Sequence, residues 1–222
     1  MSAQASIEEL FDRSAEPAVR GFLHVPAQPN GNSLVLTHGA GANCKSNLLT
    51  TLSSAFAEAG FTVLRFDLPF RQARPFGPPF PTTAERDREG VRRAIEVLKQ
   101  KTAGQIFAGG HSYGGRQTTM LIAEQPDLVE GLLLLSYPLH PPRKPEQLRT
   151  AHFPKLTRPA LFVHGSRDPF GSLEEMRSAL ELIPAHHQML EADGVGHELL
   201  PKKATSDLPK RIVKTFQDFF SE

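Results

Sequence analysis

The 222-residue sequence has a single cysteine, Cys44, and a formal net charge of only +1. One cysteine cannot form a disulfide within the chain, and it excludes a metal site built from several thiolates; such sparse usage fits a reducing compartment. A chain so close to neutrality has no overall field that would attract nucleic acid or an anionic membrane, and no nucleic-acid-binding motif is present. We therefore expect no nucleic-acid partner.

Long apolar runs are also absent. No segment stays apolar for the roughly 20 residues that a membrane-spanning helix needs. Acidic and basic side chains occupy the N-terminal segment, where a signal peptide would require an uninterrupted apolar region; they are Glu8, Glu9, Asp12, Arg13 and Glu16. We expect a cytoplasmic protein without membrane insertion. The sequence leaves its oligomeric state open.

Short apolar runs alternate with stretches whose apolar residues recur at helical spacing. The runs typical of buried strands lie at residues 34–36, 62–66, 105–108, 132–135, 160–163 and 188–190. This alternation predicts an α/β fold with a doubly wound, mostly parallel sheet covered by helices on both faces. No change in composition divides the chain, so we expect one domain over residues 1–222. In such sheets the chemistry lies beyond the carboxyl ends of the strands.

A glycine-flanked serine follows one of these predicted strands. Residues 109–115 read GGHSYGG, with Ser112 at the centre, and a predicted helix comes next. Glycines two residues on either side leave room at a sharp turn where a Cβ atom would clash, so the context predicts a nucleophile elbow. Without that context the same letters would indicate only a glycine-rich turn.

A serine hydroxyl needs a general base, and the base needs a partner that orients it. His197 lies between the last predicted strand and the last helix, and Asp168 follows the strand at 160–163. The chain order Ser112, Asp168, His197 is the order expected for a triad on a doubly wound sheet. Among the other eight histidines none combines a downstream position with a strand-to-helix loop. Asp193 is the main alternative acid, but it shares a loop with His197.

Two backbone amides are candidates for an oxyanion hole. The residue after the nucleophile, Tyr113, supplies one N–H at a helix start. The loop over residues 37–43 is rich in glycine and alanine, so its backbone can approach a substrate closely, and we assign the second N–H to Ala40.

The substrate-binding residues are less determined. A loop over residues 68–82 interleaves prolines with phenylalanines, and it could hold aromatic rings over a pocket or simply pack on the core. Phe70, Arg71 and Arg116 are candidate substrate contacts, although surface arginines are usually only solvated. The segment from residue 137 to 158 is too short and proline-rich for a compact cap domain, so we expect an open site.

These motifs together resemble the α/β-hydrolase superfamily, and specifically its small dienelactone-hydrolase-like branch. The resemblance covers roughly residues 18–220 and rests on residues 38–41, 110–115, 165–169 and 196–197. The stretch RFDLPFR, residues 65–71, resembles a group within that branch whose members are largely uncharacterised. Dienelactone hydrolases carry a nucleophilic cysteine where this chain has Ser112, so their lactone substrate is not carried over.

The sequence thus predicts a serine hydrolase, carboxylesterase-like, that cleaves a small or medium ester or thioester through an acyl-enzyme. Its partner would be a small-molecule ester, and no cofactor or metal is implied. Some relatives of the uncharacterised group are parts of larger assemblies, so a non-catalytic binding or scaffold protein is one alternative. An amidase or peptidase using the same triad is the other.

Overall fold

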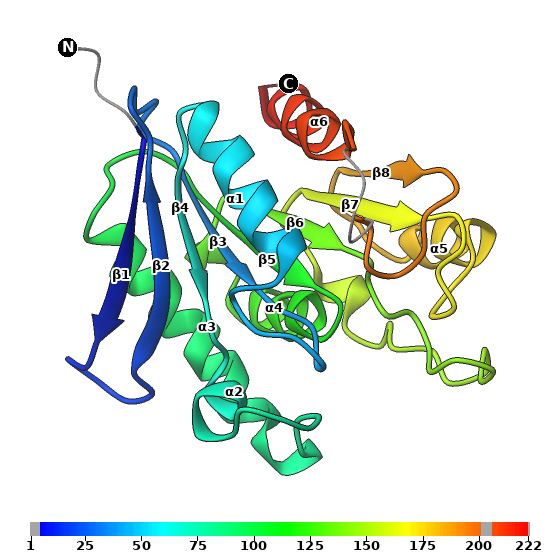
Figure 1. Ribbon diagram of the computed structural model, residues 1–222. Helices are drawn as coiled ribbons and strands as arrows, with labels where there is room; N and C mark the ends of the chain where they lie inside the picture. The colour runs from blue at the N-terminus through cyan, green and yellow to red at the C-terminus, as the bar shows by residue number, and fades with distance from the viewer. Residues whose placement is uncertain (1–4, 201–205, 222) are drawn as a thin grey trace.

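The computed structural model describes residues 5–200 and 206–221, which build one eight-stranded sheet (Figure 1). The spatial order is β1-β2-β4-β3-β5-β6-β7-β8. The strands are β1 (Ser6–Asp12), β2 (Val19–Val25), β3 (Ser33–Thr37), β4 (Thr62–Phe66), β5 (Ile106–His111), β6 (Gly131–Leu135), β7 (Ala160–Gly165) and β8 (His187–Ala192). From β4 to β8 every neighbouring pair is parallel. Strand β2 runs antiparallel to both of its neighbours, β1 and β4. The predicted fold class is confirmed.

Helices cover both faces of this sheet. They are α1 (Asn47–Glu58), α2 (Pro69–Ala73), α3 (Ala84–Lys99), α4 (Tyr113–Glu124), α5 (Leu173–Leu180) and α6 (Leu208–Ser221). Helices α1 and α6 lie on one face of the sheet and α3 and α4 on the other (Figure 1). The apolar side chains of α3, α4 and α5 form one core, and those of α1 and α6 form the other. Successive residues of a strand point to opposite faces, so Leu132 and Leu134 enter the first core and Leu133 and Leu135 the second. This explains the continuous apolar runs in the sequence.

The ends of the helices follow the local sequence. Ser172 caps α5: its hydroxyl accepts the N–H of Glu175, whose carboxylate accepts the N–H of Ser172, as the predicted capping box requires. Helix α1 stops where Gly60 takes a φ of +93°, a left-handed conformation that glycine adopts without strain. Within the described ranges, no helix combines the length and the apolar character needed to cross a bilayer.

Helix α6 closes the second core with an aromatic cluster. The ring of Phe216 lies with its centroid 5.1 Å from that of Phe56, 5.7 Å from that of Phe61 and 5.0 Å from that of Phe107, all close to edge-on. Edge-to-face contacts of this kind add to the free energy gained from burying the rings. The cluster joins the last helix to α1 and to β5, the strand that leads to Ser112.

The antiparallel hairpin of β1 and β2 was not predicted. Glu8, Glu9 and Asp12 lie on β1, which is an edge strand and is largely exposed. An edge strand with solvent on most of its surface carries no apolar run, so hydrophobic periodicity does not reveal it. The short helix α2 likewise lies inside the segment 68–82, where a loop was expected.

Candidate active site

Ser112 lies at the turn between β5 and α4, at the carboxyl end of its strand. Its backbone has φ 51° and ψ −117°, a strained conformation for a residue with a side chain. The glycines on either side fit this turn. A Cβ atom on Gly110 would lie 2.6 Å from the Thr37 carbonyl oxygen, and one on Gly114 would lie 2.6 Å from that of His38. The turn therefore packs directly against the end of β3.

The structure brings the predicted base and acid to this serine. The Nε2 atom of His197 lies 2.8 Å from the hydroxyl oxygen of Ser112, and its Nδ1 lies 2.8 Å from the Oδ2 of Asp168. The second carboxylate oxygen of Asp168 accepts the Phe170 N–H. Burial alone would raise the pKa of Asp168, but the hydrogen bond and charge of His197 and the Phe170 amide outweigh it and bring the pKa below its usual value. The carboxylate is therefore ionised and can stabilise an imidazolium.

Two aromatic side chains fix the position of the His197 ring. The ring of Phe170 lies 4.3 Å away between centroids, and that of His111 lies 5.0 Å away. His111 also donates a hydrogen bond from Nε2 to the backbone carbonyl of His197, at 2.8 Å. Burial, with the neighbouring His197, lowers the pKa of His111, so it holds this loop as a neutral ring. Sequence reasoning missed this role, because residues 111 and 197 meet only in the folded chain.

The two predicted oxyanion donors border the same hollow as Ser112. Ala40 and Tyr113 both line it, and neither backbone N–H has a hydrogen-bond partner within the part of the chain that the structure describes. The phenol of Tyr113 donates to buried Asp87, which also accepts the Phe70 N–H. These bonds hold the side chain of Tyr113 to α3 and leave its backbone N–H at the edge of the hollow.

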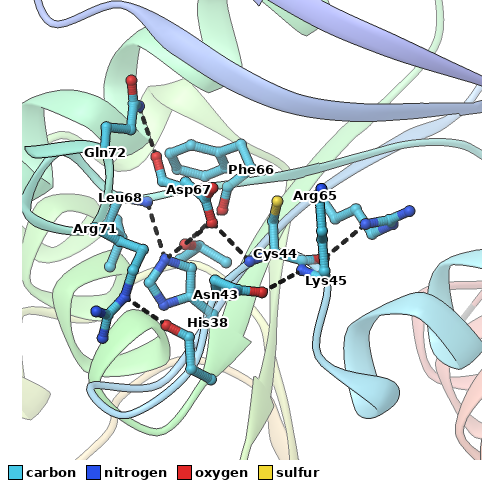
Figure 2. A network of polar contacts seen from close by, with 12 residues as sticks. His38, Asn43, Cys44, Lys45, Arg65, Phe66, Asp67, Leu68, Arg71 and Gln72 are labelled. Carbon is cyan, nitrogen blue, oxygen red and sulfur yellow. Dashed lines mark hydrogen bonds and ion pairs between the residues drawn. The ribbon is translucent and has the colours of Figure 1, made fainter. Parts of the chain in front are cut away.

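The stretch 65–71 braces the loop that carries Ala40, here called the oxyanion loop (residues 38–45). Figure 2 shows Arg65, Asp67 and Arg71 directed at it from the end of β4 and from α2. Arg65 donates to the Cys44 carbonyl at 2.7 Å, and Asp67 accepts the Cys44 N–H at 2.7 Å. His38 accepts the Leu68 N–H at Nε2, so its proton is on Nδ1 and is donated to the Gly39 carbonyl.

Arg71 is the most extensively bonded of these side chains. Its guanidinium donates to the carbonyls of Ala40 and Ala42 at 2.8 Å each, and to those of Gly77 at 3.1 Å and Arg74 at 3.3 Å. It thereby ties the oxyanion loop to the segment after α2. This geometry does not support Arg71 as a substrate contact, because its donors are occupied by the backbone.

Phe70 also lies away from the substrate side. Its ring is buried and packs edge-on against Tyr113, with centroids 5.7 Å apart, and against His38 at 5.6 Å. Neither Phe70 nor Arg71 lines the hollow beside Ser112. The structure therefore does not support a contact of Phe70 with substrate either, since its ring packs against His38 and Tyr113.

A hollow of about 500 Å³ opens beside Ser112. Its walls come from the proline-rich segment, from α4 and from the segment that follows β6; the lining residues are Ala40, Pro78, Pro79, Phe80, Pro81, Ala84, Ser112, Tyr113, Arg116, Gln117, Pro138, Arg149 and Phe170. Part of the loop 68–82 therefore does border the site, through Phe80 rather than Phe70. The segment from residue 137 to 158 contributes one wall without forming a cap domain.

The described residues contain neither a reactive cysteine nor a metal-binding cluster that could replace Ser112 in catalysis. Burial raises the pKa of the Cys44 thiol to about 12, so it is protonated and unreactive at neutral pH. No group of three or more His, Cys, Asp or Glu side chains within residues 5–200 and 206–221 is arranged to hold a metal ion.

Comparison with known proteins agrees with this architecture. The family model described as an alpha/beta hydrolase domain matches residues 30–221, and the chain belongs to that family. The expected likeness to dienelactone hydrolases is confirmed at the level of the fold: dienelactone hydrolase from Anabaena variabilis ATCC 29413 superposes with a TM-score of 0.76 at 16% identity, covering 98% of both chains.

Two further solved structures share the fold. Est1E from Butyrivibrio proteoclasticus has a TM-score of 0.74 at 14% identity, covering 96% of this chain and 99% of its own. An alpha-beta serine hydrolase homologue from Coxiella burnetii has a TM-score of 0.74 at 17% identity, covering 94% of this chain and 96% of its own. At these identities the likeness establishes the arrangement of helices and strands, and the chemistry must be argued from the residues.

Proposed function

We propose that this protein is a serine hydrolase that cleaves a small or medium carboxylic ester or thioester through an acyl-enzyme. The observation that carries the proposal is the continuous pair of 2.8 Å contacts from Ser112 through His197 to Asp168. Three side chains from distant loops meet with the geometry of a nucleophile, a general base and an orienting acid. Membership of the alpha/beta hydrolase family supports the same reading.

The reaction proceeds in two halves. The Ser112 oxygen attacks the substrate carbonyl carbon while His197 Nε2 takes the hydroxyl proton, and the carbonyl oxygen becomes an anion held by the N–H groups of Ala40 and Tyr113. Collapse of this intermediate breaks the bond to the alcohol or thiol, which leaves with the proton from His197. A water molecule, deprotonated by His197, then attacks the acyl-serine carbonyl; the bond to Ser112 Oγ breaks, His197 returns the proton to that oxygen, and the acid is released. Asp168 remains ionised throughout and stabilises the imidazolium.

A fluorophosphonate probe tests the nucleophile directly. Wild-type protein should be labelled and should hydrolyse p-nitrophenyl butyrate, whereas Ser112→Ala should do neither. Equal labelling of both proteins would remove the assignment of Ser112. Labelling without turnover of any ester in a graded chain-length panel would favour a binding or scaffold protein, and faster cleavage of a matched p-nitroanilide would favour an amidase.

A further inference from the structure

Arg116 takes part in no ion pair within residues 5–200 and 206–221. It lies in the first turn of α4, four residues after Ser112, and it lines the hollow beside that serine. Its Nε atom is buried without a hydrogen-bond acceptor among the described residues. Arg116 as a whole is partly buried, and a single buried donor without an acceptor costs free energy, which a bound anion would recover.

A second guanidinium lies on the same wall. Arg149 lines the hollow with Arg116 and donates one hydrogen bond, to the Pro138 carbonyl at 3.2 Å. Burial lowers the pKa of Arg149, and the positive charge of Arg116 lowers it further, as expected for two cations placed close together. Like charges repel unless a counterion lies between them, so this pair also favours an anion.

The surroundings contain little negative charge. No acidic residue lines the hollow beside Ser112. Arg116 and Arg149 also border a second hollow of about 290 Å³, where Lys155 adds a third cation and Glu124 is the one acid among the described lining residues. Burial and the charge of Arg116 lower the pKa of neighbouring His152 to about 4, so that imidazole is neutral at pH 7. The charged side chains that line these two hollows are therefore mostly cations.

The position of the hollow indicates which part of an ester would meet these cations. His197 protonates the leaving group in the proposed reaction, yet His197 is not among the residues that line the hollow. The imidazole borders the hollow through Phe170, which packs on it, whereas Arg116 and Arg149 line the hollow directly, so we place the acyl part of the substrate on the arginine side. Its other walls are mainly proline, phenylalanine and alanine, which suit a short methylene chain between the ester and a terminal charge.

We propose that Arg116, with Arg149 beside it, binds a carboxylate at the far end of the acyl group, so that the preferred substrates are half-esters of short dicarboxylic acids. This inference rests on the proposed hydrolase function. A charge-assisted hydrogen bond to a carboxylate is shorter and stronger than one between neutral groups, and a guanidinium can make two in parallel. Arg116 is then a specificity-determining residue.

A matched pair of esters tests the proposal. p-Nitrophenyl hydrogen glutarate and its methyl ester have the same chain and the same leaving group, but only the first carries the terminal charge. Wild type should have a kcat/KM at least about 10-fold higher for the charged ester, and Arg116→Gln should reduce that ratio by roughly 10- to 100-fold, the range expected for losing a hydrogen bond to a charged group. Arg116→Lys, which keeps the charge without the planar fork, should fall between the two. Arg211→Gln, an exposed position on α6, is the control and should keep the wild-type ratio.

A binding measurement gives a second readout that needs no turnover. Monomethyl glutarate should bind Ser112→Ala in calorimetry, and at least 10-fold more weakly when Arg116→Gln is added. A wild-type ratio near or below one, unchanged in Arg116→Gln, would overturn the anion site while leaving the hydrolase intact. Absence of turnover of both esters, together with absence of fluorophosphonate labelling, would instead refute the proposed function.

Discussion

Arg71 offers the most direct test of how the oxyanion loop is held in place. Its guanidinium is buried and donates to four backbone carbonyls, of which those of Ala40 and Ala42 belong to the loop itself. Arg71→Gln removes most of these donors. Arg71→Lys keeps the charge, but one ammonium cannot reach acceptors that are now served by Nε and by both terminal nitrogens. Both variants should release the loop.

The expected magnitude follows from the bonds that are lost. If the N–H of Ala40 no longer points at the reacting oxygen, one oxyanion donor is lost, which typically costs about 3 kcal/mol or roughly 100-fold in kcat. Buried carbonyls left without a donor cost about 1–3 kcal/mol each in folding stability, so the melting temperature should fall as well. Among the described residues of the oxyanion loop, Ala40 alone lines the hollow. Binding of substrate should therefore be little affected, and KM should change much less than kcat.

The assay is therefore kcat and KM for p-nitrophenyl butyrate, measured well below the melting temperature of each variant. Arg93→Gln is the matched control, since Arg93 is a comparably buried arginine on α3, and neither it nor its partners Asp12, Ser14 and Glu96 line the hollow. It should lower the melting temperature and leave kcat unchanged. A kcat within about threefold of wild type in Arg71→Gln, together with a lowered melting temperature, would show that Arg71 stabilises the fold and does not position the Ala40 amide.

Three other outcomes follow from the structure. Asp168→Asn should lower kcat by roughly 10⁴-fold, the loss typical when the orienting carboxylate of such a triad becomes an amide, and stopped assays from pH 6 to 9 would measure it. The folded-state pKa of Asp168 is lowered, so its ionised carboxylate stabilises the folded protein fully above about pH 4, and this stabilisation is lost as the pH falls through the folded-state pKa. The drop in melting temperature at acid pH should therefore be smaller in Asp168→Asn than in wild type. The Cys44 thiol, with its pKa raised to about 12, should resist a disulfide reagent at pH 8 until the protein is unfolded; rapid reaction of native protein would contradict its burial.

The sequence predicted the parts of the fold that depend on residues close together in the chain. The strands β3 to β7 are buried on both faces and carry continuous apolar runs, and the capping box of α5 involves residues three apart, so both were readable directly. The hairpin of β1 and β2 has no such signal because its edge strand is polar and exposed. The elbow and the loops after β7 and β8 could be placed because parallel strands bring their carboxyl ends to one edge.

The same reasoning could not separate two arginines that look alike in the sequence. Arg71 and Arg116 both follow strands on the same edge of the sheet, and both were candidates for substrate binding. Their roles differ in where their donors go, which is set by contacts between residues about 30 positions apart: Ala40 and Ala42 accept from Arg71, whereas no carbonyl approaches the Nε of Arg116. A buried polar group is almost always paired. A guanidinium already paired with backbone therefore supports the site, whereas Arg116, which forms no ion pair among the described residues, is the one that we propose binds substrate.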